Sequence, residues 1–493
     1  MMPVVLLSIS RSRFRPYWVP PLLAAMALGG CSLLPSVGPD YQAPRLELPS
    51  LWRSPVPAMA PPASASQRLA DWWRQLDDPV LDTLIQRALA ANPDLRVAQA
   101  RVRQARASRD GAVGGYFPTV SGSLDASRSK SAKATSSTAA SRKTRTLWDG
   151  GFDAVWEIDI FGGTRRAVEA ADADLAASQA EAEDARVTLV AEVAQTYVDL
   201  RGYQRRLEIA RDNLATQTET LQIIEWRLQA GLASSADVEQ ARTNREQTRA
   251  AIPDLENGLA EAGNRMAVLV GESPGAVQSL AAEARPLPEV PEMVATVIPA
   301  DILRQRPDLV AAERTLAAET ARVGQRLAER FPSLSLNGSF GWQAYRLASL
   351  GGAGTLARAV GGGLAATLFD GGRLRSAVEV QDAVQEQALI SYESSVLTAL
   401  EEVENALQAY AASRERIDAR RAAAQAARNA AQLSRGMYQA GLADFQQVLD
   451  TERTLLATED NLAVAEATRL ASLITLYKAL GGGWEPTMDR GEG

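Results

Sequence analysis

Histidine is absent from this chain of 493 residues, and cysteine occurs only once. Without histidine, the chain cannot form a catalytic triad, a general base or a metal site that depends on an imidazole. A single cysteine excludes internal disulfides, four-cysteine zinc sites and iron–sulfur clusters. Aromatic residues make up 5% of the chain, which is little for a large globular core. The formal charge is −7 and no long basic block occurs, so nothing indicates nucleic-acid binding.

The first 30 residues are predicted to be a leader rather than part of the fold. Three arginines between residues 11 and 15 precede an apolar run at 19–28, which is too short to span a bilayer as a helix. The run ends in Leu28-Gly29-Gly30-Cys31. This pattern resembles a bacterial lipoprotein signal, which implies that Cys31 becomes the lipid-modified N-terminus. Because Ser32 follows the cysteine, the resemblance also implies an outer-membrane address. An ordinary signal peptide with an incidental cysteine is the alternative.

Proline is missing from two very long tracts, between Pro118 and Pro253 and between Pro332 and Pro486. Since proline interrupts helices, both tracts are expected to hold long unbroken elements. Apolar residues recur every seven positions in each tract, a pattern typical of coiled coils. We expect helices over about 166–230 and 374–440, each roughly 100 Å long at about 1.5 Å per residue. The recurring residues are Val193, Leu200, Leu207, Leu214, Leu221 and Leu228 in the first tract, and Leu389, Val396, Val403, Tyr410, Ile417, Ala424, Ala431 and Tyr438 in the second.

Segments ahead of these helices alternate between apolar and polar residues. The alternation covers 119–127, 148–159 and 333–342, and continues less sharply through a glycine-rich stretch at 360–369. About ten residues is the length of a tilted membrane strand with an apolar outside and a polar lumen. Hairpins that face solvent on both sides remain the alternative.

The chain also contains an internal duplication. Several blocks recur in the same order, at an offset of 214 residues early in each half and 210 residues later. The matched blocks include Asn92-Pro93-Asp94-Leu95 with Arg306-Pro307-Asp308-Leu309, Ala167-Val168-Glu169 with Ala377-Val378-Glu379, and Ala230-Gly231-Leu232-Ala233 with Ala440-Gly441-Leu442-Ala443. Two strands in each half are too few to close a barrel, and open edges in lipid leave backbone groups unpaired. The chain is therefore expected to pool its strands with two further copies.

Further segments carry a resemblance to a known family. They are Val37-Gly38-Pro39-Asp40-Tyr41, Trp72-Trp73 with the stretch 78–89, and the stretch 476–484. Together with the duplicated blocks, they resemble the outer-membrane efflux protein family (TolC-like), in its OprM/NodT-type lipoprotein branch. The resemblance implies an α+β fold: a mainly helical trimeric channel whose twelve-stranded antiparallel β-barrel, with four strands from each chain, continues into a long coiled-coil α-barrel.

The resemblance also implies a division of the chain and a set of partners. The expected parts are a signal peptide at 1–30, a lipid-anchored lead-in at 31–78, a first repeat at 79–271, an equatorial connector at 272–298, a second repeat at 299–481 and a tail at 482–493. The partners would be two further copies in a homotrimer, a periplasmic adaptor, an inner-membrane pump that is usually proton-driven, and outer-membrane lipid. The channel would passively export drugs or other small molecules. No cofactor and no nucleic acid is implied.

Members of this family close their periplasmic end near the second Ala-Gly-Leu turn. The residues that resemble this aperture are Asp450 and Arg453, with Gln446 where a related channel has a leucine constriction. Three Asp450 carboxylates around one axis would attract cations and repel one another, and Arg453 lies three residues on, on the same helical face. The aligned residue of the first half is Gln240, so an acidic ring would come from the second half alone. Ordinary solvated helix positions are the alternative for both charges.

Other classes of protein fit the sequence less well. An enzyme is not expected, because the acidic residues form no paired-carboxylate motif and the glycine runs match no phosphate-binding loop. A structural or adhesive lipoprotein with a coiled-coil stalk and no pore would explain the heptads and the lipid. It would not explain four alternating segments placed symmetrically in two halves.

Overall fold

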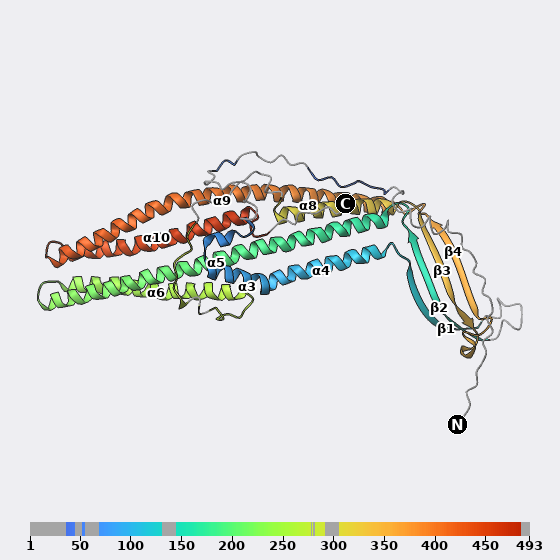
Figure 1. Ribbon diagram of the computed structural model, residues 1–493, viewed down its shortest axis with the longest axis horizontal. Helices are drawn as coiled ribbons and strands as arrows, with labels where there is room; N and C mark the ends of the chain where they lie inside the picture. The colour runs from blue at the N-terminus through green and yellow to red at the C-terminus, as the bar shows by residue number, and fades with distance from the viewer. Residues whose placement is uncertain are drawn as a thin grey trace, which may run out of the picture. The chain divides into compact units, whose positions relative to one another are not determined.

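The computed structural model describes residues 36–44, 52–54, 69–130, 144–277, 279, 282–290 and 305–484. After a short 3₁₀ helix, η2 (Trp72–Leu76), and a helix, α3 (Pro79–Ala91), the same series of elements occurs twice. The first series is α4 (Pro93–Gly114), β1 (Thr119–Ser129), β2 (Arg145–Ile158), α5 (Gly163–Gln229) and α6 (Ser235–Leu269). The second series is α8 (Pro307–Ala328), β3 (Ser333–Ala344), β4 (Leu356–Ala365), α9 (Arg373–Gln439) and α10 (Phe445–Ala479), with a 3₁₀ turn, η6 (Leu347–Ser349), between the strands (Figure 1).

The duplication is visible in the lengths of the helices. Both α4 and α8 have 22 residues, α5 and α9 have 67, and α6 and α10 have 35. The residue just before α4 and the residue just before α8 also make a similar hydrogen bond. Asn92 Nδ2 donates to the carbonyl of Leu269 at 3.0 Å, and Arg306 Nη1 donates to the carbonyl of Ala479 at 2.8 Å. Each half thus ties the end of its returning helix to the start of its first helix. The ranges expected for the long helices, 166–230 and 374–440, are confirmed to within a few residues.

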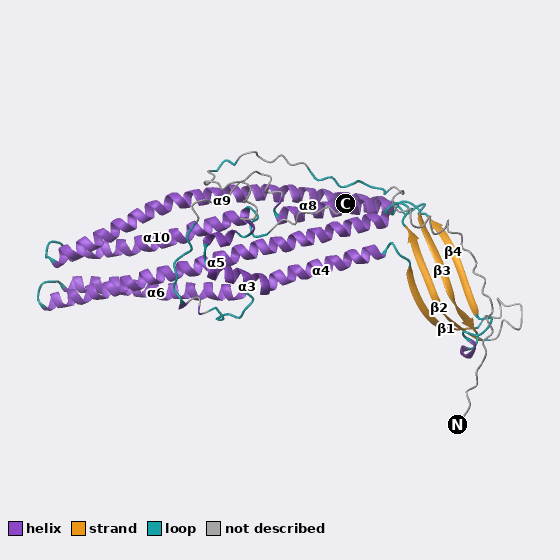
Figure 2. Cartoon of the chain, in the orientation of Figure 1, coloured by secondary structure: helices purple, strands orange, loops and turns teal. Residues whose placement is uncertain are grey.

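Two compact units divide the chain in space, and each draws on both halves of the sequence. Unit 1 comprises Met1–Pro39, Val113–Ala167 and Ala321–Glu379, and it contains the four strands. They form one antiparallel sheet in the order β1-β2-β3-β4, drawn in orange in Figure 2. Each sequence half therefore supplies one hairpin, and β2 pairs with β3 to join the two hairpins.

The register of the sheet separates apolar from polar side chains. In one row, Gly122 faces Phe152, which faces Phe340, which faces Arg358. Because side chains alternate along a strand, the even-numbered positions share one face, which we call the apolar face. That face carries Val120, Leu124, Trp148, Phe152, Trp156, Leu336, Phe340, Trp342, Val360 and Leu364. Serine, asparagine, aspartate and glutamate occupy the odd-numbered face, which confirms the expected alternation.

The last strand begins earlier than the sequence indicated. A strand was expected over 360–369, whereas β4 covers Leu356–Ala365. Leu368 and Phe369 are 96% and 91% exposed and follow the strand. Three successive glycines at 361–363 removed the side chains that mark alternation, so the apolar pair that follows shifted the prediction towards the C-terminus.

Unit 2 comprises Asp40–Ala112, Val168–Thr320 and Val380–Gly493. Its main core joins segments from both ends of the sequence: Trp72 stacks on Tyr477 with 5.1 Å between ring centroids, and Gly483 N donates to the carbonyl of Leu69. Most of the expected heptad residues are buried in this unit: Val193, Leu200 and Val403 are at most 1% exposed, whereas Leu228, next to the turn, is 37% exposed. No helix among the described residues is both long enough and apolar enough to cross a membrane.

Candidate functional site

The candidate site lies in unit 2, where α5 turns into α6 and α9 turns into α10. Gly231 and Gly441 have φ values of 73° and 75°, which favour glycine over residues with a Cβ. The next residues, Leu232 and Leu442, donate their backbone N–H groups to carbonyls five residues back, at 2.7 and 2.8 Å. This is the Schellman arrangement that ends many helices. The returning helices begin at once, because Ser234 and Asp444 cap them with side-chain oxygens.

The three predicted aperture residues lie on the first three turns of α10, and all three are exposed. Gln446 Nε2 donates to Asp450 Oδ1 at 3.1 Å. Arg453 Nε donates instead to Asn244 Oδ1 on α6 at 3.0 Å. Among the described residues Asp450 and Arg453 form no ion pair, so within one chain Arg453 ties α10 to α6 and Asp450 keeps a solvated carboxylate.

A buried carboxylate lies on the opposite face of α10. Glu452 is 1% exposed, and its Oε1 accepts from Arg435 Nε on α9 and from Thr220 Oγ1 on α5, both at 3.0 Å. Burial raises the pKa of Glu452, while Arg435 and the Thr220 hydroxyl act in the opposite direction. Ionisation of the buried Glu452 carboxyl therefore opposes folding. The contribution of Glu452 to the stability of the protein decreases as pH rises through its folded-state pKa. One carboxylate thus joins three helices.

Sequence reasoning missed Glu452, although a signal was present. The residue follows Phe445, Val448 and Leu449 at intervals of three to four, on the buried stripe of α10. An acid on an apolar stripe is unusual and needs a partner. The partners, Thr220 and Arg435, lie 232 and 17 residues away in sequence, so the period alone could not identify them.

Further contacts hold the two helical hairpins together. Arg206 on α5 makes two hydrogen bonds to Asp460 on α10, at 2.7 and 3.2 Å. Arg227 on α5 donates to the carbonyl of Tyr438 on α9, and its guanidinium lies 4.4 Å from the centre of that ring. An apolar cluster of Leu221, Ile224, Val238, Ala241, Phe445, Val448 and Leu449 fills the space near the turns. Part-buried polar contacts and apolar packing therefore act together between the two hairpins.

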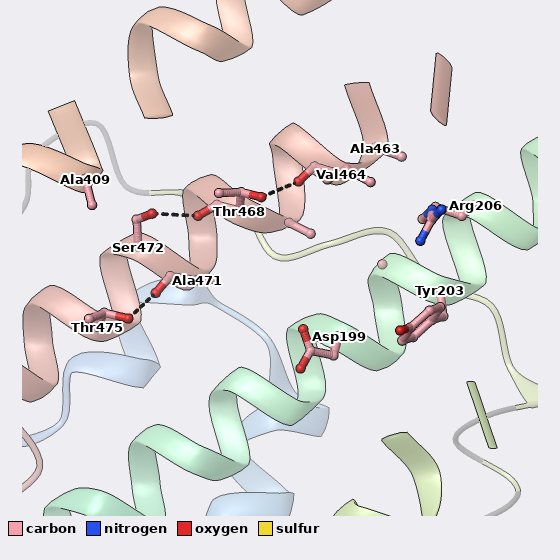
Figure 3. Close-up of a pocket in the computed structure, with 12 residues that line it drawn as sticks. Asp199, Tyr203, Arg206, Ala409, Ala463, Val464, Thr468, Ala471, Ser472 and Thr475 are labelled. Carbon is pink, nitrogen blue, oxygen red and sulfur yellow. Dashed lines mark hydrogen bonds between the residues drawn. The ribbon is translucent and has the colours of Figure 1, made fainter. Parts of the chain in front are cut away.

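A groove of about 340 Å³ lies between α5 and α10, further from the turns (Figure 3). Asp199, Tyr203 and Arg206 line it from α5, and small residues of α10 line the other side. The hydroxyls of Thr468, Ser472 and Thr475 donate to carbonyls of their own helix, at 2.7 to 3.0 Å. Burial raises the pKa of Asp199. Because Arg206 is already paired with Asp460, the groove presents small side chains rather than a set of free donors.

Two other sequence predictions concern a metal site and the lipid attachment residue. In the part of the chain that the structure describes, no three acidic or cysteine side chains gather as a metal site would require. The predicted lipid attachment residue, Cys31, lies outside the described residues.

Comparisons with known proteins place these features in context. A sequence profile described as "Outer membrane efflux protein" matches this chain twice, at residues 84–272 and 298–482. The pyoverdine export outer membrane protein OpmQ of Pseudomonas putida is 33% identical over 451 residues, which cover 89% of this chain and 92% of that protein. Nodulation protein T of Rhizobium leguminosarum bv. trifolii is 32% identical over 403 residues, or 80% and 82% of the two chains.

A solved structure shares the fold. The outer-membrane channel OprN superposes on this chain with a TM-score of 0.82 and 36% sequence identity, covering 91% of this chain and 100% of that one. The mostly helical chain with a small antiparallel sheet therefore has the architecture of a TolC-like outer-membrane channel subunit, as the sequence predicted.

The junction at Glu452 yields a prediction. Replacing Glu452 by alanine should lower the free energy of unfolding by about 1–3 kcal/mol, because Arg435 and Thr220 are left without the acceptor that they share. Backbone amides of α5 around Thr220 should also exchange hydrogen faster than in the wild type. Chemical denaturation combined with hydrogen-exchange mass spectrometry would measure both effects.

Glu459→Ala is the matched control. Glu459 also lies on α10 and accepts from Arg428 on α9 at 2.6 Å, but it contacts α5 through no hydrogen bond or ion pair among the described residues. Its loss should leave exchange in α5 unchanged. Equal exchange in α5 for both variants would contradict the role assigned to Glu452.

Proposed function

Because this chain belongs to the outer membrane efflux protein family, we propose that three copies of it assemble into the exit channel of an efflux system. The protein is an outer-membrane component of such a system. In the proposed assembly, the sheets of three chains close into one twelve-stranded barrel, and their long helices form a tube that continues from it.

The sheet of unit 1 is the observation that carries this proposal. Its outer strands, β1 and β4, each have one edge without a partner strand among the described residues, and one of its faces is almost wholly apolar. Backbone groups left unpaired in lipid cost several kcal/mol each. Pairing β4 of one copy with β1 of the next removes both edges at once, and it keeps every apolar face on the outside.

The proposed partners follow from what the chain itself does not supply. Its sequence contains no nucleotide-binding motif, so the energy for transport comes from elsewhere. We assign that role to an inner-membrane pump, most simply a proton-driven one, joined to this channel by a periplasmic adaptor. The cargo is drugs or other small molecules, which cross the channel passively.

The assembly can be tested directly. Purified protein should have the mass of a trimer in native mass spectrometry and should give single-channel conductance in planar bilayers. Leu336→Pro should sharply reduce the yield of trimer, since Leu336 lies in β3 between Trp156 and Gly362, where proline removes a backbone donor. A stable monomer with native β structure and no conductance would instead support a non-pore lipoprotein with a coiled-coil stalk.

The lipid anchor is a separate proposal, supported by the leader that precedes Cys31. Two or more acyl chains give stable anchoring where a single chain is marginal. Cys31→Ala should therefore abolish incorporation of labelled palmitate in cells, while the strands still insert. A wild-type protein that takes up no label and retains a free thiol would contradict the anchor.

We also propose that the turns of α9 and α10 form the periplasmic aperture. Arg453 ties α10 to α6, so Arg453→Ala should loosen the closed end and raise resting conductance. Asp450→Ala should lower the preference for cations by about fivefold, equivalent to about 1 kcal/mol of lost attraction. The Asp450→Ala effect should weaken between 0.1 M and 1 M salt, as the Debye length falls from about 10 Å to about 3 Å, whereas the Arg453→Ala effect should persist because Asn244 carries no charge.

Asp418→Ala is the control for the charge change at Asp450. Asp418 lies on α9, far from the turn, and its side chain is 81% exposed beside Arg421. It should alter neither selectivity nor resting conductance. Unchanged selectivity in Asp450→Ala, together with unchanged conductance in Arg453→Ala, would place the aperture elsewhere.

A further inference from the structure

Positive charges gather at one end of the sheet, although the whole chain has a formal charge of −7. At this end β1 ends and β2 begins, and β3 ends and β4 begins. Its described cations are Arg128, Lys130, Arg145, Arg346 and Arg358, and all are exposed. The sequence has no acidic residue between Asp125 and Asp149, and none from Tyr345 through Phe369. The end of the sheet that holds these connections is therefore strongly cationic.

The two faces of the sheet differ in the sign of their charges. Arg128, opposite Thr146, and Arg358, opposite Phe340, occupy even-numbered positions and so belong to the apolar face. No acidic residue lies on that face. The acids of the sheet all lie at odd-numbered positions on the other face: Asp125, Asp149, Asp153 and Glu157. Arginine is thus the only charged residue type on the apolar face, where Thr146 is uncharged.

Both arginines lie next to a band of tryptophan. Trp148 and Trp342 belong to the apolar face, with Ala126 opposite Trp148 and Leu356 opposite Trp342. Arg128 lies two residues beyond Ala126, towards the end of β1, a distance of about 7 Å along a strand. Arg358 lies two residues beyond Leu356 on the other side of the tryptophans, in the row of Phe340. Tryptophan is typical of the boundary between the apolar and polar layers of a membrane. A long arginine side chain on either side of this band can extend along the sheet and place its charge towards the membrane surface.

Arg358 is also available for a ligand. It forms no hydrogen bond or ion pair with any residue that the structure describes, and it lines a shallow hollow of about 590 Å³ on the sheet. Val120, Phe152, Phe340 and Val360 line the same hollow, which Asp153 and Ser339 of the odd-numbered positions border. An apolar surface beside an unpaired guanidinium suits a molecule that carries both an acyl chain and an anionic group. Guanidinium groups bind phosphate through paired hydrogen bonds.

We propose that this end of the apolar face binds phosphorylated lipid of the outer leaflet, with Arg358 and Arg128 contacting phosphate groups and the aromatic residues contacting acyl chains. The inference rests on the proposed barrel, since it needs the apolar face to meet lipid. The opposite end of the same face, around Trp156, Ile158 and Leu364, has no cation. Lipid selection is therefore confined to one side of the membrane.

Binding of fluorescent diphosphoryl lipid A to the purified trimer in neutral detergent would test the proposal. Arg358→Gln and Arg128→Gln should each weaken binding by about fivefold, which is the loss expected for one arginine near anionic lipid. Arg358→Lys should retain most of the affinity because it keeps the charge. Arg145→Gln is the matched control: Arg145 lies at the same end of the sheet but on the odd-numbered face, so its loss should have little effect.

Two further probes identify the source of the phosphate. Dephosphorylated lipid A should bind weakly, and millimolar inorganic phosphate should not displace the phosphorylated lipid, because free phosphate lacks the acyl contacts. Equal binding of both lipids, or unchanged affinity in Arg358→Gln, would overturn the proposal. Conductance measured on the same preparations distinguishes failure of the lipid-binding inference from failure of the proposed channel. A conducting trimer without lipid selectivity contradicts only this inference, whereas a preparation that neither assembles nor conducts contradicts the channel itself.

Discussion

Unpaired backbone at the two edges of the sheet is the constraint on which the rest of the assembly depends. Strands β1 and β4 each present a row of donors and acceptors that no other strand of the described chain pairs with. Water would satisfy them on a soluble protein, but lipid cannot. Closure with further copies resolves this, and it also brings the long helices of several chains around one axis. The tube below the barrel is thus a consequence of how the strands must be completed.

The helical hairpins of unit 2 face the opposite problem in the proposed aperture, because there they must hold together and yet separate. An apolar cluster alone would favour a fixed contact. Here Glu452 is buried between α5, α9 and α10, and a second, part-buried pair joins Arg206 to Asp460 across the same hairpins. Buried ion pairs add little net stability compared with apolar packing, but they specify one arrangement and weaken sharply when either partner is lost. Such contacts suit the opening without unfolding that the proposed aperture requires.

Local patterns in the sequence predicted most of the fold. Heptads such as Val193, Leu200 and Leu207 placed the long helices, and alternation placed three of the four strands. Where the pattern was weak, at Gly361–Gly363, the predicted strand was displaced. The site was harder to predict, because its contacts join residues far apart in sequence. Arg453 was expected to act with nearby Asp450, yet it bonds to Asn244, 209 residues away. Helical periodicity gives the face of a residue but not the partner across the interface.

The two halves of the chain share a backbone plan but differ in chemistry at their turns. With the offset of 210 residues, Asp450 corresponds to Gln240, and buried Glu452 corresponds to Arg242, which is exposed and pairs with Glu225 and Glu239 on its own hairpin. Equal lengths are required because both hairpins must reach the same end of the tube. Equal charge is not required, and in the proposed aperture carboxylates on one hairpin of each chain give half as many acids around the axis as carboxylates on both hairpins would. Because like charges repel most strongly at a narrow axis, this asymmetry is compatible with the closed, cation-selective end that we propose.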